Sequence, residues 1–230
     1  MWRFDFINHL IKSKGYTSYL EIGLADCDRN FNQIKCEHKS GVDRKTLEDL
    51  TNVESNKRIK LYAPCTSDTF FKKYIERNYD IIFVDGSHEE ADVDKDIDNS
   101  LKHLNEGGVI IIHDCMPPEW DMAQEKPMRG KWCGTVWRSI VKIRCSRNDL
   151  KLNIVDCDLG CGILEKGEQE VYKAHSLEIG NFLKKTETIY LTSYLQKNFL
   201  IFINELVSYR RMWVYRVELH KSCNKQKKYL

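Results

Sequence analysis

The sequence has few glycines where a dinucleotide-binding protein needs them. The dinucleotide fingerprint Gly-x-Gly-x-x-Gly uses three glycines to bring the backbone close to a pyrophosphate. The corresponding segment here, Glu21–Asp26, contains only Gly23, and Asp26 and Asp28 would repel phosphates. The sequence also lacks a Tyr-x-x-x-Lys pair near the predicted ligand crevice. Both absences argue against a nicotinamide-dependent oxidoreductase.

The sequence also lacks a long apolar run and a large excess of charge. No stretch approaches the ~20 apolar residues that span a bilayer, and the first residues do not have the pattern of a signal peptide. The formal net charge of the 230 residues is only +2, which gives no general attraction for nucleic acid or membranes. We therefore expect a cytoplasmic protein without a membrane span.

Cysteine is abundant, but its spacing does not match a metal site or a disulfide framework. Nine cysteines in a chain without a secretory signal predict reduced thiols. Cys157 and Cys161 form the close pair, and neither a second pair nor nearby histidines complete a zinc site. We expect most of the thiols to be small core or surface residues.

Residues 79–115 predict a strand, a helix and a second strand. Asp80–Asp85 and Val109–Ile112 are apolar runs, and Glu106–Gly108 ends the intervening helix, whose inward residues are Val93, Ile97, Leu101 and Leu104. Continuous rather than alternating apolar residues are typical of parallel strands covered on both faces. The two strands should be parallel neighbours joined by a right-handed crossover.

The rest of the chain extends this unit into a larger sheet. Five more strands are predicted at Tyr19–Gly23, Lys39–Asp43, Arg58–Tyr62, Leu152–Asp156 and Gly162–Leu164. Helices are predicted at Phe4–Lys14, around Phe31–Ile34, from Thr69 and at Gly134–Arg144, with an irregular lid or substrate wall at Met116–Lys131. The pattern indicates an α/β protein with a doubly wound, mostly parallel, seven-stranded Rossmann-like sheet and an antiparallel strand near its C-terminal edge.

We expect residues 1–170 to form this domain and residues 171–230 to form a C-terminal helical extension with a basic tail. The apolar run Phe199–Val207 is too short to span a bilayer and predicts a helix on the sheet or on a second subunit, which would give a homo-oligomer. The basic tail has interleaved aromatic residues, but a solvated tail explains it better than a nucleic-acid surface does.

Four residues that carry chemistry follow two neighbouring strands. Ligands of open parallel sheets bind outside the carboxyl ends of the strands. Asp85 and His88 follow one such end, and His113 and Asp114 follow the next. We expect all four in one crevice, although Asp85 and Asp114 would also serve as caps of the segments that follow them.

The first two strands indicate which ligand the crevice takes. Glu21 and Asp43 lie about twenty residues apart, the spacing at which such folds place an acid on the ribose hydroxyls. A ligand without phosphates suits the glycine-poor turn, and S-adenosylmethionine offers a sulfonium, an ammonium and a ribose. Asp68 would contact the adenine amino group or, as we favour, cap the helix that includes Thr69.

Taken together, these segments resemble the class I S-adenosylmethionine-dependent methyltransferases, and among them the metal-dependent sugar (macrocin-type) O-methyltransferases of macrolide biosynthesis. The resemblance covers residues 4–165. The segments that carry it are Tyr19–Gly23, Gly41–Asp43, Thr66–Phe71, Asp85–His88, Gly107–Val109, His113–Cys115 and Gly134–Trp137.

The resemblance implies a role for each matching residue. His88 would be the general base; the cofactor would be bound by Glu21, Gly23, Asp43, Ser67, Asp68 and Asp85; a divalent cation, Mg²⁺, would be bound by Asp85, His113 and Asp114. The similar enzymes carry two adjacent acids on the second strand, where this chain has His113-Asp114, and Mg²⁺ prefers oxygen ligands.

The function implied is O-methylation of a small hydroxylated, sugar-like acceptor. A bound cation would lower the pKa of the hydroxyl, and His88 would take its proton. The alternative is a catalytically inactive protein that keeps the fold as a binding module or scaffold. The glycine-poor turn, His113 and the unusual C-terminal segment favour that alternative, in which His88 merely opens a helix.

Overall fold

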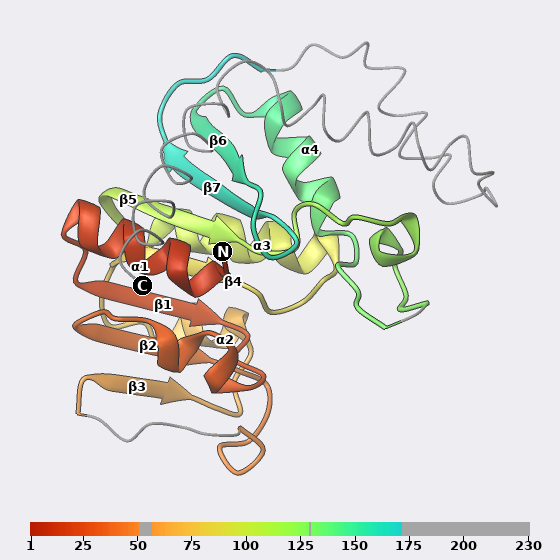
Figure 1. The fold of residues 1–230 in the computed structure, drawn as a ribbon. Coiled ribbons are helices and arrows are strands. Elements are labelled where there is room, and N and C mark those ends of the chain that lie inside the picture. The colour runs from red at the N-terminus through yellow and green to blue at the C-terminus, as the bar shows by residue number, and fades with distance from the viewer. Residues whose placement is uncertain (51–56, 129, 172–230) are drawn as a thin grey trace, which may run out of the picture.

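The fold is a seven-stranded sheet covered by helices on both faces (Figure 1). The computed structural model describes residues 1–50, 57–128 and 130–171. The strand order is β3-β2-β1-β4-β5-β7-β6. The strands are β1 (Ser18–Ile22), β2 (His38–Val42), β3 (Ile59–Tyr62), β4 (Tyr79–Val84), β5 (Leu104–Ile112), β6 (Leu150–Val155) and β7 (Cys161–Lys166).

The first five strands of the chain are parallel, and β7 alone runs antiparallel to its neighbours β5 and β6. The predicted doubly wound Rossmann-like sheet and its antiparallel strand near the C-terminal edge are confirmed. Leu104, predicted at the end of a helix, instead begins β5 because the preceding helix ends at Lys102.

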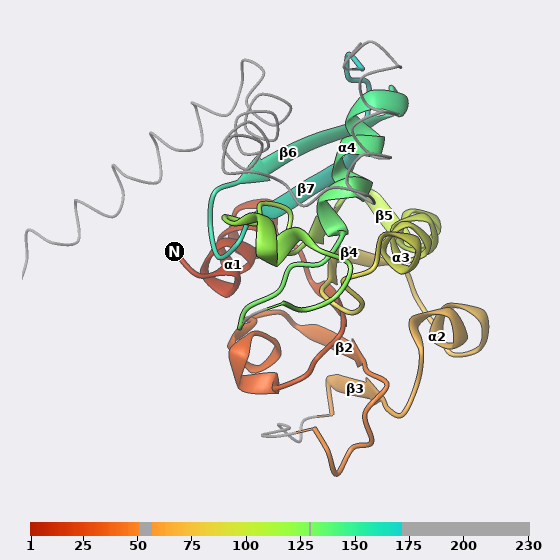
Figure 2. The same ribbon diagram turned by 90° about the vertical axis from the view of Figure 1, so that its right-hand side faces the viewer.

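The two faces of the sheet have different cover (Figure 2). Helices α2 (Ser67–Lys73), α3 (Glu90–Lys102) and α4 (Val136–Ser146) pack one face, where Phe70, Val93 and Ile140 join a core with Ile82 and Ile110. Helix α1 (Arg3–Lys14) packs the other face through residues such as Phe6 and Leu10. Their apolar residues recur at helical spacing, which orients one side of each helix towards the sheet.

The helix predicted around Phe31–Ile34 is wrong. Two short 3₁₀ turns, η1 (Cys27–Arg29) and η2 (Phe31–Gln33), connect β1 to β2. Asp26 accepts a hydrogen bond from the backbone nitrogen of Asp28, and such local bonds compete with helical ones. A third turn, η3 (Trp120–Ala123), gives the segment predicted as irregular a packed element, since Met122 and Ala123 are buried.

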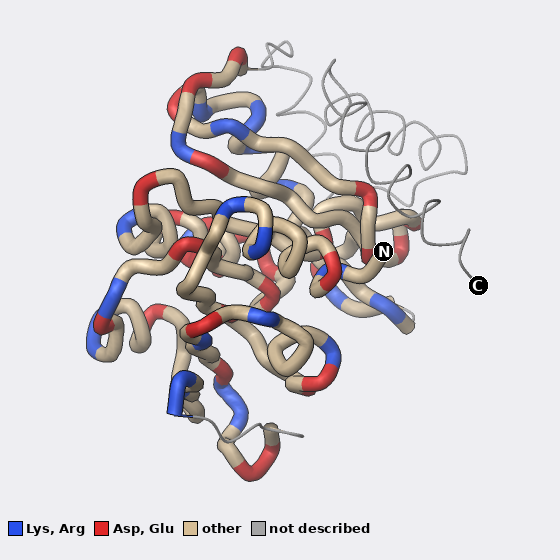
Figure 3. Tube along the Cα trace, turned by 60° about the vertical axis from the view of Figure 1, so that its left-hand side comes forward, with Lys and Arg blue, Asp and Glu red and all other residues tan. Residues whose placement is uncertain are grey.

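The proposed boundary after residue 170 falls where the described residues end, so the predicted extension, its apolar run Phe199–Val207 and the basic tail lie outside them. Among the residues that are described, no helix is both long and apolar enough to cross a membrane. Acidic and basic positions are interspersed along the trace (Figure 3).

Candidate active site

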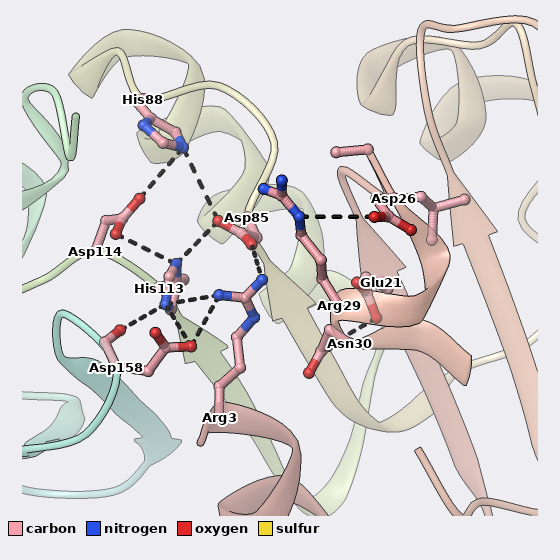
Figure 4. Close-up of polar contacts among 12 residues, drawn as sticks. Arg3, Glu21, Asp26, Arg29, Asn30, Asp85, His88, His113, Asp114 and Asp158 are labelled. Carbon is pink, nitrogen blue, oxygen red and sulfur yellow. Dashed lines mark hydrogen bonds and ion pairs between the residues drawn. The ribbon is translucent and has the colours of Figure 1, made fainter. Parts of the chain in front are cut away.

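The carboxyl ends of β4 and β5 bring Asp85, His113 and Asp114 together. One ligand-type atom from each lies within 4.8 Å of the others. Parallel register places Val84 beside Ile112, so the residues after both strands emerge at the same level. Asp114 adopts a left-handed φ of 60°, which Asp tolerates better than most residues. The predicted gathering of these three side chains is therefore confirmed (Figure 4).

His113 lies at the centre of the cluster and is 5% exposed. Its Nδ1 lies 3.1 Å from Asp85 Oδ1 and 3.3 Å from Asp114 Oδ1, while Nε2 lies 2.7 Å from the carbonyl oxygen of Asp158. Burial alone would lower the pKa of His113, but the charge of Asp85 and hydrogen bonds to Asp114, Asp158 and Asp85 hold it well above its usual value. Acceptors opposite both ring nitrogens favour the imidazolium form.

His88 faces the same carboxylates from the loop before α3. Its Nε2 lies 3.3 Å from Asp114 Oδ2 and 3.9 Å from Asp85 Oδ1. Its Nδ1 lies 2.8 Å from the carbonyl oxygen of Trp132, which can only accept, so Nδ1 carries the hydrogen of the neutral ring. Nε2 is then the nitrogen directed into the site, towards the carboxylates of Asp114 and Asp85.

A segment far along the chain positions His88. The backbone nitrogen of Thr135 donates to the carbonyl oxygen of His88 at 2.7 Å, and Thr135 Oγ1 accepts from the nitrogen of Glu90. Gly134 has φ +62°, and a Cβ there would lie 2.1 Å from the His88 oxygen. Only glycine allows this approach, which gives the Gly134–Trp137 segment a physical role.

Two further residues of the site, Arg3 and Asp158, were not predicted. Arg3 Nη1 lies 2.9 Å from Asp158 Oδ2, and Arg3 Nη2 lies 3.8 Å from Asp85 Oδ2. The hydrogen bond of His113 and then the charge of Arg3 lower the pKa of Asp158 against the opposing effect of burial. Burial would raise the pKa of Asp85 too, but His113 and Arg3 lower it, so both acids are ionised.

Three backbone nitrogens at the start of the turn after β1 already have hydrogen-bond acceptors. Gly23 donates to the carbonyl oxygen of Val42, and Leu24 and Ala25 both donate to Asp43 Oδ2, at 2.8 and 3.0 Å. A pyrophosphate would find these amides already bonded. Gly23 has φ +89°, and a Cβ there would lie 2.3 Å from the Asp85 oxygen, so the ends of β1 and β4 approach closely. This turn fits a nucleoside ligand without phosphates.

Glu21 points away from this turn into the core. Its Oε2 accepts hydrogen bonds from Tyr19 Oη at 2.6 Å and Asn30 Nδ2 at 2.9 Å. The side chain is 1% exposed, and burial raises its pKa to about 8. The cofactor role expected for Glu21 stays a prediction. The structure places its carboxyl on the α1 side of the sheet, where it contacts Tyr19 and Asn30, and Figure 4 shows Asn30 beside it.

The buried acid makes stability depend on pH. In the folded protein Glu21 keeps a proton that the unfolded chain loses above its ordinary pKa of 4.5. Its stabilising contribution is complete below that value and is lost as the pH rises through about 8. We expect Glu21→Gln to raise the free energy of unfolding at pH 9 by up to ~5 kcal/mol and to change it little at pH 5.

Urea unfolding at pH 5, 7 and 9 measures this effect. The control is Glu37→Gln, since Glu37 is exposed and should leave the pH dependence unchanged. Parallel pH profiles for wild type and Glu21→Gln would show that Glu21 is ionised in the folded protein.

The residues predicted near adenine lie at the start of α2. Thr66, not Asp68, caps this helix: Thr66 Oγ1 accepts from the nitrogen of Thr69 at 3.2 Å. The favoured interpretation of Asp68 as the cap is therefore wrong, because the helix begins earlier than expected. Asp68 instead accepts from Asn99, and Ser67 hydrogen-bonds buried Asp96, whose pKa burial raises to about 6.

The cluster of Asp85, His113 and Asp114 does not fit a magnesium ion as it is arranged. Mg²⁺ takes oxygen ligands at about 2.1 Å in an octahedron. Both nitrogens of His113 face acceptors, so the ring offers no lone pair, and the Arg3 guanidinium occupies the other side of Asp85. The expected metal role of these residues stays a prediction that the hydrogen-bond chemistry disfavours.

Comparison with known proteins agrees with this architecture. Residues 13–115 match a family model described as a methyltransferase domain. A comparison with curated protein sequences finds no match.

Solved structures similar to the chain include three methyltransferases. An O-methyltransferase from Bacillus cereus, in complex with S-adenosylhomocysteine, is 14% identical with a TM-score of 0.52, over 72% of this chain and 80% of that one. An O-methyltransferase of tomaymycin synthesis from Streptomyces achromogenes, in complex with S-adenosylmethionine, is 13% identical with a TM-score of 0.53, over 71% of this chain and 79% of that one. A methyltransferase from Podospora anserina, bound to S-adenosylhomocysteine, is 12% identical with a TM-score of 0.54, over 72% of this chain and 78% of that one.

Residues 13–115 match a methyltransferase domain, and the sheet order agrees with the fold of the class I, S-adenosylmethionine-dependent methyltransferases. The resemblance to this class, which rested on separate short segments of the sequence, is confirmed.

Proposed function

We propose that this protein transfers the methyl group of S-adenosylmethionine to a hydroxyl oxygen of a small, sugar-like or phenolic acceptor, with His88 as the general base. The observation that carries the proposal is the position of His88 Nε2, which faces Asp114 and Asp85 at the carboxyl ends of β5 and β4. The O-methyltransferases among the similar structures agree with an oxygen acceptor.

The residues of the crevice divide the work between binding and proton transfer. S-adenosylmethionine supplies a methyl carbon on a positively charged sulfur, which an oxygen nucleophile can displace in line. Gly23 and Asp43 line its binding region, and Asp43 keeps the β1 turn in place through Leu24 and Ala25. His88 takes the proton of the acceptor hydroxyl at Nε2 while the oxygen is methylated.

Asp114 supports the base in the proton transfer. An alcohol is a poor nucleophile until its proton is removed, and the imidazolium formed on His88 then carries a positive charge. Asp114 Oδ2, 3.3 Å from Nε2, stabilises that charge in a site with little water, since Asp114 is 3% exposed. Trp132 and Thr135 hold the ring and its loop in place, so the base needs no rearrangement to act.

Calorimetric titration of S-adenosylmethionine, with and without a chelator, tests the proposal together with methyl transfer. We expect binding with a micromolar Kd in both conditions, and formation of S-adenosylhomocysteine when catechols, hydroxycinnamates or sugars are added. Absence of binding in both conditions would refute the function. Binding without turnover by any acceptor would favour the inactive binding or scaffold protein.

A further inference from the structure

Arg3 enters the site from a different layer of the fold than the other residues. It is the first residue of α1, which packs on the face of the sheet opposite to α3. Its guanidinium lies between Asp158, at 2.9 Å, and Asp85, at 3.8 Å, and its side chain is 15% exposed. Figure 4 shows this group beside the His113 ring, where Nη1 lies 3.3 Å from Nε2.

The hydrogen bonds of His113 determine its charge. Nε2 lies 2.7 Å from the carbonyl oxygen of Asp158, which only accepts, and farther, at 3.3 Å, from the donor Nη1 of Arg3, so Nε2 carries a hydrogen. The carboxylate of Asp85 opposite Nδ1 requires a second one. Arg3 and His113 are thus two cations in contact with the same acids. A guanidinium and an imidazolium placed this close are stable only with carboxylates between and around them.

The charges of the cluster balance in a way that suits the proton transfer. Three carboxylates, those of Asp85, Asp114 and Asp158, face the two cations and leave one net negative charge. When His88 takes a proton, its imidazolium neutralises the remaining charge. A divalent ion added to the same cluster would make it positive before His88 had accepted anything, which disfavours the proton transfer.

We propose that Arg3 and His113 are the resident cation of this site and exclude the divalent metal that similar sugar O-methyltransferases use. The two side chains neutralise and orient Asp85 and Asp114, and the protein transfers methyl groups without a metal. Only the consequence for methyl transfer rests on the proposed function. The exclusion of metal is a property of the resting site and can be tested without turnover.

Titration with Mn²⁺, followed by the electron paramagnetic resonance signal of the free ion, tests this proposal directly. We expect wild-type protein to bind Mn²⁺ no more tightly than about 1 mM. Arg3→Gln removes one cation and should bind Mn²⁺ at least about tenfold more tightly, while Arg3→Lys keeps the charge and should behave as wild type. This difference separates the charge of Arg3 from its contribution to packing.

A second variant gives an independent test of His113. His113→Asp replaces the cation with an oxygen ligand and should create a Mn²⁺ site. His113→Asn is the matched control that adds no charge, and it should bind Mn²⁺ less tightly than His113→Asp does. Circular dichroism confirms that each variant is folded before titration. Micromolar binding of Mn²⁺ by wild-type protein would overturn the proposal even if no variant folds. Equal Mn²⁺ affinity in Arg3→Gln and wild type would also overturn it.

Discussion

Replacing His88 with glutamine is expected to lower kcat for methyl transfer by about 10²–10⁴-fold, the usual contribution of a general base. Glutamine keeps a polar side chain of similar length but cannot accept the proton that the hydroxyl must lose. Affinity for S-adenosylmethionine should stay within about twofold, because His88 contacts Asp114, Asp85 and Trp132 rather than the β1 turn. Calorimetry and turnover, measured on the same preparation, give both quantities.

The control is His9→Gln, since His9 is exposed on α1 and should leave both quantities unchanged. Unaltered kcat in His88→Gln would remove His88 from the mechanism. A parallel loss of cofactor affinity and kcat would instead give it a binding role.

The second large effect is expected from Gly134→Ala. An alanine Cβ would lie 2.1 Å from the His88 oxygen, so the His88 loop must move. Displacement of a catalytic group by about 1 Å can lower kcat by ~10²-fold, and we expect a loss of that order. Strain at the left-handed φ of +62° and the displaced loop should together lower the free energy of unfolding by about 2–4 kcal/mol.

Gly107→Ala separates strain from displacement. Gly107 has a similar φ of +70°, but nothing lies within 4 Å of a Cβ built there. This variant should lose only about 1 kcal/mol and keep its kcat. If Gly134→Ala kept full kcat, or if Gly107→Ala lost as much, the contact between Gly134 and His88 would not be what positions the base.

The sequence predicted those parts of the site that depend on strand register. Asp85, His113 and Asp114 follow continuous apolar runs, and parallel neighbours bring such residues to the same edge. The sequence also indicates on which face of the sheet Glu21 lies. Side chains alternate between the two faces along a strand, so Glu21 shares a face with Tyr19, and that face is apolar. The spacing between Glu21 and Asp43, which is typical of ligand-binding acids, instead suggested that Glu21 faces the ligand.

The contacts that join distant segments could not be predicted from spacing. The sequence predicts only that Arg3 lies in the first turn of an amphipathic helix. The residues around it do not indicate that it pairs with Asp158. Likewise, the sequence predicts only a helix boundary at Gly134. The structure shows that the backbone oxygen of His88 lies too close for a side chain at this position. The 3₁₀ turns after β1 were missed because Phe31 and Ile34 are buried at a spacing that a helix shares.

The hydrogen bond between Arg3 and Asp158 joins residues 155 positions apart. Asp158 lies in the turn between β6 and β7, the last strands of the described chain to be synthesised. Closing so long a loop costs conformational entropy, so we expect this contact to form after the contacts of the central strands. A folding intermediate that has β1, β4 and β5 paired but lacks this hairpin would leave Asp85 without its guanidinium. Recovery of activity during refolding should therefore lag behind formation of the sheet, which makes the site a reporter of the final docking step.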